Sequence, residues 1–312
     1  MGMRSRLYGL TVESPRALSR PADPASPVDV VIEFDDEPAD QSDPIDGTTV
    51  LLDPAESRRY ELVRRADGSL RYRLNGLADV EIDEDWSDLS CRMVPGADPR
   101  LLDVVLAGLV MATRMSIAGD VVLHSSGIEV DGSVVGLVGR SGGGKSTLAA
   151  MSCLAGARLV TDDVLRLRPR DGAFWCPTGV GHLRLRPTSK VLAENEDVAH
   201  DMSGDGRHLF APDLAADREH RVDRLVMIRL VTEDGRLLRQ RIPDAAALMA
   251  MMHQQRVLGW RDPDLNARHF AGLGELIDRV PVYAIDVPWG VEAGGIGEPL
   301  LELLTTPDDE AS

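Results

Sequence analysis

The sequence predicts an α/β protein, in which a core with a mixed sheet is preceded by a smaller β-rich domain. Residues 1–95 alternate apolar and polar side chains in short runs between turn residues, which is typical of a β-rich unit. From about residue 96, a helical pattern is followed by apolar strands that alternate with helices. We expect domains at 1–95 and 96–305, followed by an acidic tail at 306–312 that is frayed.

Turn residues divide the first domain into short segments. Residues 1–22 begin with an apolar-alternating stretch and end in Pro-rich sequence, and 35–47 is expected to be an acidic loop. The pair Asp67-Gly68 is typical of a hairpin turn. The strands that we expect here are 28–34, 48–52, 59–64 and 70–74.

A long helical pattern opens the second domain, because residues 98–118 carry apolar side chains near helical spacing. The apolar run 134–138 is typical of a buried strand, and a Gly-rich loop separates it from an expected helix at 145–154. The other expected strands are 121–123, 127–130, 158–161, 182–185, 224–231 and 282–287, and the other helices are 244–256 and 273–278.

Charge and composition exclude several classes of protein. The net charge is −17 and the sequence pI is about 4.8, so the surface repels nucleic acid and anionic membranes, and we expect neither as a partner. The first residues lack the apolar region of a signal peptide, and the longest apolar run, 101–113, is too short to span a bilayer. Cys91, Cys153 and Cys176 show neither zinc-site nor disulfide spacing. We therefore expect a cytoplasmic protein.

One glycine-rich segment carries a strong motif, since 139–147 matches the pattern G-x-x-x-x-G-K-[ST] of phosphate-binding loops, or P-loops. Its residues are Gly139, Arg140, Ser141, Gly142, Gly143, Gly144, Lys145, Ser146 and Thr147. Glycines let backbone amides approach phosphate oxygens, and the positive end of the next helix points to the same place. We therefore expect ATP and Mg²⁺, with Lys145 on the terminal phosphates and the Ser146 hydroxyl as a metal ligand.

Two adjacent aspartates, Asp162 and Asp163, follow the expected strand 158–161, at a place that lies beside the phosphates in such an architecture. One carboxylate can hold Mg²⁺, and the other can accept the proton of a substrate hydroxyl. Because adjacent acids repel, the pKa of one should rise and make it a better base. A solvated turn is the alternative. His124 ends the strand before the P-loop strand, and a lone histidine is more often structural.

Together these segments resemble the catalytic core of the HPr kinase/phosphorylase family. The similar segments are Leu123-His-Ser-Ser-Gly127, the P-loop with Ser141 before its glycines, and Leu159-Val-Thr-Asp-Asp163. His124 lies 21 residues before Lys145, and the two aspartates lie 17 and 18 residues after it, as in that family. The resemblance is strong over 121–165 and weak over 166–290.

The resemblance implies a core of the HPr kinase/PEP carboxykinase type and ATP-dependent phosphorylation of a hydroxyl. It implies that Asp163 is the base toward the acceptor, that Asp162 serves the metal and that His124 orients a carboxylate. Ser141 would contact phosphate. Which of the two aspartates is the base stays open. The family forms hexamers, so a homo-oligomer is a further expectation.

Two departures bear on the acceptor. The family carries Glu where this chain has Thr147, and its E-I-R-G-type signature is not evident, the nearest stretch being 179–187. The chain is more similar to stand-alone HPr-kinase-like proteins of peptide-modification type, including lasso-peptide tailoring kinases, which phosphorylate serine on a precursor peptide. Gly206-Arg207 resembles a basic element of that group, and Arg207 could hold a phosphate or a carboxylate. We expect a peptide, protein or small-molecule hydroxyl as the acceptor.

Further arginines and a methionine-rich stretch are weaker candidates. Arg184 and Arg186 share one strand face and could line an anion site, although a solvent-facing position is favoured. The stretch 249–252 could form an adaptable groove, but its helical spacing favours core packing. We interpret the end of that helix, 254–256, as cap and surface.

Three functions are considered. The first is a kinase that acts on serine or a similar hydroxyl, and the second is a non-kinase P-loop NTPase. The third is a regulatory protein that only binds ATP. ABC-type and GTPase signatures are missing, and the intact set of Lys145, Ser146, Asp162 and Asp163 favours the kinase.

The first domain is assigned to substrate selection, because the second already holds the groups for phosphoryl transfer. Its short strands would offer edges to which an extended peptide could pair by strand addition. Its acidic loop would favour a basic or neutral segment of peptide. A cover that only buries core surface is the alternative.

Overall fold

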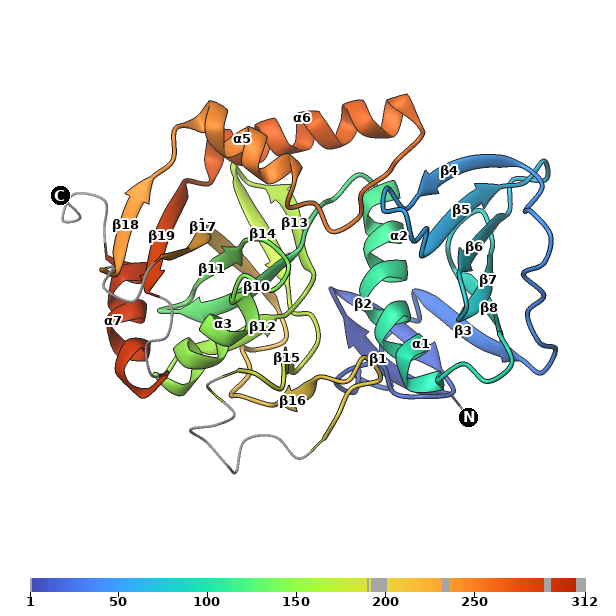
Figure 1. Cartoon of the computed structure of the whole chain (residues 1–312), viewed down its shortest axis with the longest axis horizontal. Helices are drawn as coiled ribbons and strands as arrows, with labels where there is room; N and C mark the ends of the chain where they lie inside the picture. Colours follow the sequence, from blue (N-terminus) through green and yellow to red (C-terminus); the bar gives the residue numbers. More distant parts are fainter. Residues whose placement is uncertain (1, 190, 192–200, 232–235, 289–292, 307–312) are drawn as a thin grey trace.

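Two large mixed sheets, a small two-stranded sheet and the helices around them make up the described part of the chain (Figure 1). The computed structural model describes residues 2–189, 191, 201–231, 236–288 and 293–306. The expected α/β class with mixed sheets is confirmed. Apart from residue 306, the expected tail lies outside the described residues. None of the helices in the described part of the chain has the length and apolar character needed to cross a bilayer.

The first sheet is built from the strands of residues 2–95, in the order β1-β2-β3-β8-β7-β6-β5-β4. They are β1 (Met3–Leu7), β2 (Leu10–Ser14), β3 (Val30–Asp35), β4 (Thr48–Leu52), β5 (Tyr60–Arg64), β6 (Leu70–Leu74), β7 (Ala78–Ile82) and β8 (Asp88–Met93). β3 is parallel to both of its neighbours, β2 and β8. The predicted strands β3 to β6 are found within two residues, and Gly68 turns the predicted hairpin with a φ of 89°.

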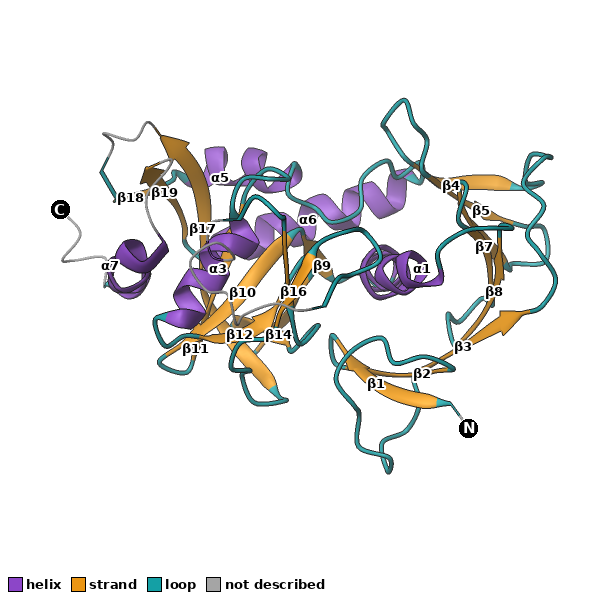
Figure 2. Cartoon of the chain, turned by 60° about the horizontal axis from the view of Figure 1, so that its bottom comes forward, coloured by secondary structure: helices purple, strands orange, loops and turns teal. Residues whose placement is uncertain are grey.

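A long helical segment lies inside the curve of this sheet (Figure 2). It consists of α1 (Pro99–Val105), the π-helical η1 (Leu106–Val110) and α2 (Met111–Ile117). The Asp98 side chain caps its start by accepting a hydrogen bond from the amide of Arg100 at 2.9 Å. Leu102 and Leu106 are fully buried in one cluster with side chains of the sheet. The helix predicted at 98–118 is therefore confirmed, and its core partner is the sheet that precedes it.

The second sheet contains the strand that leads into the glycine-rich loop. Its strands are β9 (Val121–Leu123), β10 (Ser125–Val130), β11 (Ser133–Val138), β12 (Arg158–Thr161), β13 (Leu165–Arg170), β14 (Ala173–Pro177), β17 (Glu219–Val231), β18 (Leu238–Arg241) and β19 (Val282–Pro288). Their order is β12-β10-β11-β17-β14-β13-β9, and β19 pairs with β17 and β18. Because β11, β17 and β19 are parallel, their carboxyl ends meet at one edge. A separate pair is formed by β15 (Leu183–Leu185) and β16 (His208–Phe210).

Helices cover both faces of the second sheet (Figure 1). They are α3 (Lys145–Leu154) and α7 (Ala293–Thr305) on one face, and α5 (Asp244–Met252) and α6 (Pro263–Arg279) on the other. α6 is much longer than the predicted 273–278, because Asp262 caps it and Pro263 starts it. In α5, Met251 is fully buried and Met252 packs partly buried against the same cluster, while Met249 is 59% exposed, so core packing holds for Met251 and Met252 but not for Met249.

Both outer strands of the first sheet are already paired with the same chain. Arg6 N donates to Arg20 O, and Ala22 N donates to Arg4 O, each at 2.9 Å along β1. At the opposite edge, Leu52 N in β4 donates to Gly259 O at 3.1 Å. The free edges expected for strand addition are therefore not present at these positions, because the chain's own loops use their backbone groups.

Candidate active site

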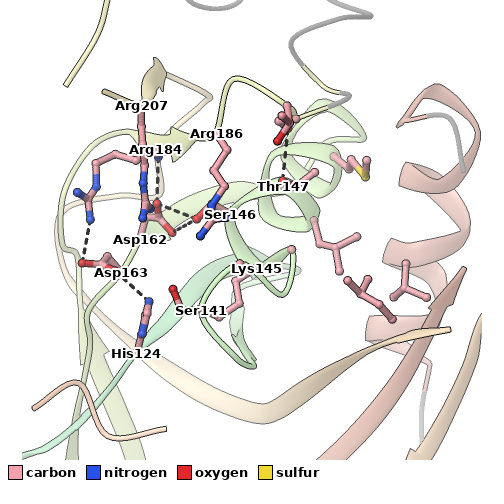
Figure 3. A pocket seen from close by; sticks show the side chains of 18 of the residues that line it. His124, Ser141, Lys145, Ser146, Thr147, Asp162, Asp163, Arg184, Arg186 and Arg207 are labelled. Carbon is pink, nitrogen blue, oxygen red and sulfur yellow. Dashed lines mark hydrogen bonds and ion pairs between the residues drawn. The ribbon is translucent and has the colours of Figure 1, made fainter. Parts of the chain in front are cut away.

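The glycine-rich loop joins the end of β11 to the start of α3 (Figure 3). Gly142 and Gly144 have φ angles of 77° and 89°, which glycine adopts without strain. The Lys145 ammonium donates to Gly139 O at 2.9 Å and to Arg140 O at 3.3 Å, so it folds back over the loop. Burial lowers the pKa of Lys145 below its ordinary value, and the two nearby aspartates oppose that shift.

Asp162 is buried beside the loop and accepts hydrogen bonds from hydroxyl and amide groups. Ser146 Oγ donates to its Oδ1 at 2.9 Å, and Ser126 Oγ donates to the same oxygen at 2.6 Å. The Arg184 amide donates to Asp162 Oδ2 at 3.1 Å. Asp162 is only 2% exposed, so these donors stabilise its charge in place of water. The side chain predicted to serve the metal therefore lies against the P-loop serine.

Asp163 points to a different set of partners, on the His124 side of the site (Figure 3). His124 Nε2 lies 3.1 Å from its Oδ1. Arg184 and Arg256 each place an Nη2 atom 2.9 Å from its Oδ2. Asp163 has a φ of 67°, a left-handed conformation that aspartate adopts more readily than most residues. This turn lets two consecutive residues direct their carboxylates to different neighbours.

The charge state of Asp163 differs from the sequence-based expectation. Burial by itself would raise the pKa of this carboxyl, but Arg256, His124 and Arg184 together hold it well below its usual value. The expected rise in pKa through repulsion between the two adjacent acids is therefore wrong for Asp163, because paired cations outweigh both repulsion and burial. In this state Asp163 is a stabilised anion and a weak base.

These residues line a cavity of about 260 Å³. Its polar side consists of His124, Ser141, Gly142, Gly144, Lys145, Ser146, Thr147, Asp162, Asp163, Arg184, Arg186, Thr188, Ser189 and Arg207. Its apolar side consists of Leu148, Met151, Leu230, Val287, Pro288 and Ile296. The predicted residues Gly139, Arg140 and Gly143 belong to the loop but do not line the cavity that the described residues form. One cavity thus combines cations, carboxylates and hydroxyls with a set of apolar side chains.

Arg184 is a site residue that sequence analysis placed in solvent. Only 11% of its side chain is exposed, and it pairs with Asp163 and, at 2.8 Å, with Asp205. Arg207 Nε lies 3.3 Å from the same Asp205 carboxylate, so the predicted Arg207 does reach the cavity. Arg186 also lines the cavity, next to Gly142. Arginine and leucine alternate over residues 183–186, so the sequence shows that both arginines lie on one face of the strand. Which face points to the cavity depends on the elements packed on either side of the strand, and the sequence does not give these.

Arg256 and Ser126 are further site residues without a predicted role. Arg256 was interpreted as helix end and surface, yet α5 ends at Met252, and the chain beyond it runs back to the site. Because Arg256 and Asp163 are 93 residues apart in the sequence, no local pattern predicts that they are in contact. Ser126 lies two residues after the predicted His124, in the segment 123–127, and its hydroxyl donates to Asp162. Its strand β10 also contains Ser125 and Glu129, so nothing in the sequence distinguished Ser126 as a site residue.

The oxygen atoms of Ser146 and Asp162 suit a magnesium ion. Mg²⁺ prefers one or two carboxylate or hydroxyl ligands together with phosphate oxygens and water. Ser146 Oγ lies 2.9 and 3.1 Å from the two carboxylate oxygens, so both residues can face one ion. Among the described residues, no group of three His, Cys, Asp or Glu side chains could hold a metal by itself. With Ser146 and Asp162 as its protein ligands, a Mg²⁺ would take its remaining ligands from water and phosphate oxygens.

The comparisons with known proteins gave different results for families, curated proteins and solved structures. No model of a protein family matches the chain, and no curated protein matches it. Among solved structures, the chain is similar to the Hpr(Ser) kinase/phosphatase from Coxiella burnetii, with a TM-score of 0.32 and 15% sequence identity. The similarity covers 59% of this chain and 93% of that chain. The chemistry of the site therefore has to be inferred from its own side chains.

Proposed function

We propose that the protein is an ATP-dependent kinase with a core of the HPr kinase/PEP carboxykinase type. It transfers the γ-phosphoryl group to a hydroxyl, and serine of a precursor peptide or protein is the favoured acceptor. The single observation that supports this most is the cavity in which Lys145 and Ser146 of a glycine-rich loop meet Asp162 and Asp163. Phosphoryl transfer needs little beyond such positioning and charge stabilisation.

The nucleotide would lie along the cavity. Its phosphates would bind the loop, Ser141 and Lys145, because backbone amides and a helix start favour anions there. Arg186 and Arg207 line the same polar side and supply further positive charge. The apolar side, formed by α3, α7 and the ends of β17 and β19, suits a nucleobase.

Ser146 and Asp162 would hold Mg²⁺, which supplies neutralisation of phosphate charge when it is bound. The acceptor hydroxyl then forms a bond to the γ-phosphorus while the bond to the leaving ADP breaks. The proton of that hydroxyl passes to Asp163, whose carboxylate His124 orients at 3.1 Å. Because two arginines hold this carboxylate, at least one of them would have to move toward phosphate for Asp163 to act as a base.

That same pairing favours a second candidate, an ATP-binding regulatory protein or NTPase without kinase activity. An aspartate stabilised by Arg184 and Arg256 is a poor base as it stands. The two candidates differ in product, because only a kinase leaves phosphate on an acceptor. Self-association, tested by light scattering, is part of the proposal in either case.

The test starts with nucleotide binding. ATP with Mg²⁺ should raise the melting temperature, because a ligand at 100 times its Kd stabilises the native state by about 2.7 kcal/mol. Lys145→Ala should abolish the shift, while Arg100→Ala, at the exposed start of α1, should retain it. ADP release is then measured with and without a serine peptide, and mass spectrometry looks for the added phosphate. An unchanged shift in Lys145→Ala would place the nucleotide elsewhere, and ADP release without phosphopeptide would favour the second candidate.

A further inference from the structure

The segment 254–261, called the strap here, connects α5 to α6 and contacts both parts of the molecule. Its first end runs along β9. His124 N donates to Gln254 O at 2.7 Å, and Arg256 N donates to Val122 O at 2.9 Å. These two hydrogen bonds flank the antiparallel bridge between Leu123 and residue 255. The backbone of His124 and that of Arg256 are therefore fixed relative to each other.

The other end of the strap is bonded to the edge of the first sheet. Leu52 N donates to Gly259 O at 3.1 Å, and Arg261 N donates to Val50 O at 2.8 Å. Tyr60 Oη of β5 donates to Leu258 O at 3.0 Å. Gly259 has a φ of 100°, and a Cβ there would lie 1.9 Å from Leu52 O, so only glycine fits this approach.

Between its two anchored ends the strap places Arg256 on Asp163. The contact from Arg256 Nη2 to Asp163 Oδ2 is 2.9 Å, and 20% of the Arg256 side chain is exposed. Arg256 Nε is buried, and it has no hydrogen-bond partner among the described residues. A guanidinium that leaves a donor unpaired is held in place by its surroundings, because in water it would satisfy all its donors.

The π-helical turn η1 packs against the pair formed by Arg256 and Asp163. A Cβ on Gly108 would lie 3.3 Å from Arg256 Nη2, which is a tight contact, and 3.5 Å from Asp163 Oδ2, which is an ordinary one, so Gly108 lies directly against both partners. π-turns inside α-helices occur often at functional sites, because they displace the backbone locally. The helix that packs on the first sheet thus borders the Asp163 carboxylate directly.

We propose that Arg256 is a positioning residue for the phosphoryl-transfer site. Through the strap, the first sheet then helps to fix the position of the Asp163 carboxylate. This inference rests on the proposed kinase function. The strap ties Asp163 to β4 through Arg256, and it ties His124 to the same segment through Gln254. The first domain therefore acts on catalysis through the geometry of Asp163, besides any part that it takes in selecting a substrate.

The test compares two strap variants with a matched control. Arg256→Gln removes the contact to Asp163, and Tyr60→Phe removes the hydroxyl that holds Leu258 while Arg256 stays intact. The control, Arg16→Gln, breaks the 2.7 Å pair between Arg16 and Asp103, which joins the same sheet to α1 away from the strap. Arg256→Lys keeps a charge that can make one contact.

Turnover of ATP with Mg²⁺ and the serine peptide, followed as ADP release, is the first readout. Arg256→Gln should lower kcat by about 10- to 100-fold and leave the KM for ATP within about twofold, because the loss is one of orientation. Arg256→Lys should recover part of kcat, and Tyr60→Phe should lower it by a smaller factor. Arg16→Gln should lower the melting temperature but leave kcat unchanged. Unchanged kcat in Arg256→Gln, or an equal loss in Arg16→Gln, would overturn the proposal.

A second readout separates this inference from the kinase proposal. In protein labelled with ¹³C at the aspartate carboxyls, the Asp163 signal is identified by its loss in Asp163→Asn. It should shift in Arg256→Gln and in Tyr60→Phe but not in Arg16→Gln. If no variant, including the wild type, releases ADP, the kinase proposal fails while these shifts still support the positioning role. A signal that stays in place in both strap variants refutes that role whatever the turnover.

Discussion

At the scale of single residues, the neighbouring aspartates differ in their hydrogen-bond and ion-pair partners. Asp162 accepts from the hydroxyls of Ser126 and Ser146, which keeps it next to the loop that would hold phosphate. Asp163 faces His124 and two guanidinium groups instead. The left-handed φ of 67° at Asp163 creates this difference between adjacent residues. Under the proposed function, this difference suits Asp162 to hold the metal and Asp163 to face the acceptor.

Replacing Asp163 should separate binding from transfer. Asp163→Asn should keep the ATP-dependent rise in melting temperature, because the amide has nearly the same shape. Transfer to the acceptor should fall by about 10²–10⁴, since the amide cannot accept the hydroxyl proton. His124→Ala should cost less, if it only orients the carboxylate. Phosphopeptide formation measures both variants, and wild-type turnover in Asp163→Asn would remove it from the role of base.

At the scale of elements, β11 brings the loop to the site by packing very closely on its neighbours. A Cβ on Gly136 would lie 2.6 Å from Leu225 Cδ2 and 3.0 Å from Leu165 Cδ2. Glycine at the middle of the strand therefore lets two leucine side chains close over the sheet. The continuous apolar run that predicted this strand is explained by burial on both faces.

Gly136→Ala should destabilise the fold by about 1–3 kcal/mol, because overpacking forces the two leucines to shift. Gly274→Ala in α6 is the matched control, since nothing lies within 4 Å of a Cβ there. In a helix interior this change should stabilise by ~0.5–1 kcal/mol. Urea unfolding measures both free energies. Equal stabilities of the two variants would contradict the close packing at Gly136.

α6 should make stability depend on pH through His269. Burial lowers the pKa of this imidazole, whose Nε2 lies 3.0 Å from Ser116 O. The unfolded chain binds the proton near the ordinary value of about 6.5, so the stability from neutral His269 is present above that pH and is lost as pH falls below it. Buried His182 and His220 act in the same direction.

The measurement is the free energy of unfolding in urea between pH 7.5 and pH 5. The wild type should lose stability over this range, and His269→Gln should lose less, because one of the protonating groups is gone. His253, at the end of α5, is exposed to solvent, so His253→Gln serves as the control. A decline of the same size in His269→Gln would rule out His269 as a contributor.

At the scale of the whole molecule, the first sheet and the second meet around the site. The turn between β1 and β2 contacts the second sheet through Tyr8, which has a φ of 51°. The Tyr8 carbonyl accepts a hydrogen bond from Arg166 Nη1 at 2.8 Å. Tyr8 is 1% exposed, and a Cβ on Gly179 would lie 2.7 Å from its ring. The long helix lies within the first sheet and also borders Asp163. The two predicted domains thus pack directly against each other and are not separated by a free linker.

A chain that begins at residue 96 should therefore be insoluble. It would expose Leu102, Leu106 and Met111, each of which is fully buried against the first sheet. The fraction of protein in the supernatant is compared with that of the full chain expressed in the same way. A soluble fragment that melts cooperatively and still responds to ATP would contradict this expectation. Transfer by such a fragment to the same acceptor would then test the role of residues 1–95 in substrate selection.

The sequence alone predicted the elements whose signal is local. The strand before the loop, α3 and the strand before Asp162 are found as expected, because apolar runs, glycines and a helix pattern specify them within a few residues. β13, β14 and α7 were not predicted. Pro169 in β13 and Pro177 in β14 weaken the strand pattern of this hairpin, and Pro299 and several glycines weaken the helical pattern of α7.

The sequence by itself thus determined the loop, its lysine and serine, and the aspartate pair, since their chemistry depends on spacing along one stretch of chain. Only the tertiary structure decided which arginines reach Asp163 and what its pKa is. Arg184 and Arg256 come from distant segments, and their approach is set by strand pairing and by the strap. Electrostatic energies depend on distance in space and on burial, and neither can be derived from the order of residues alone.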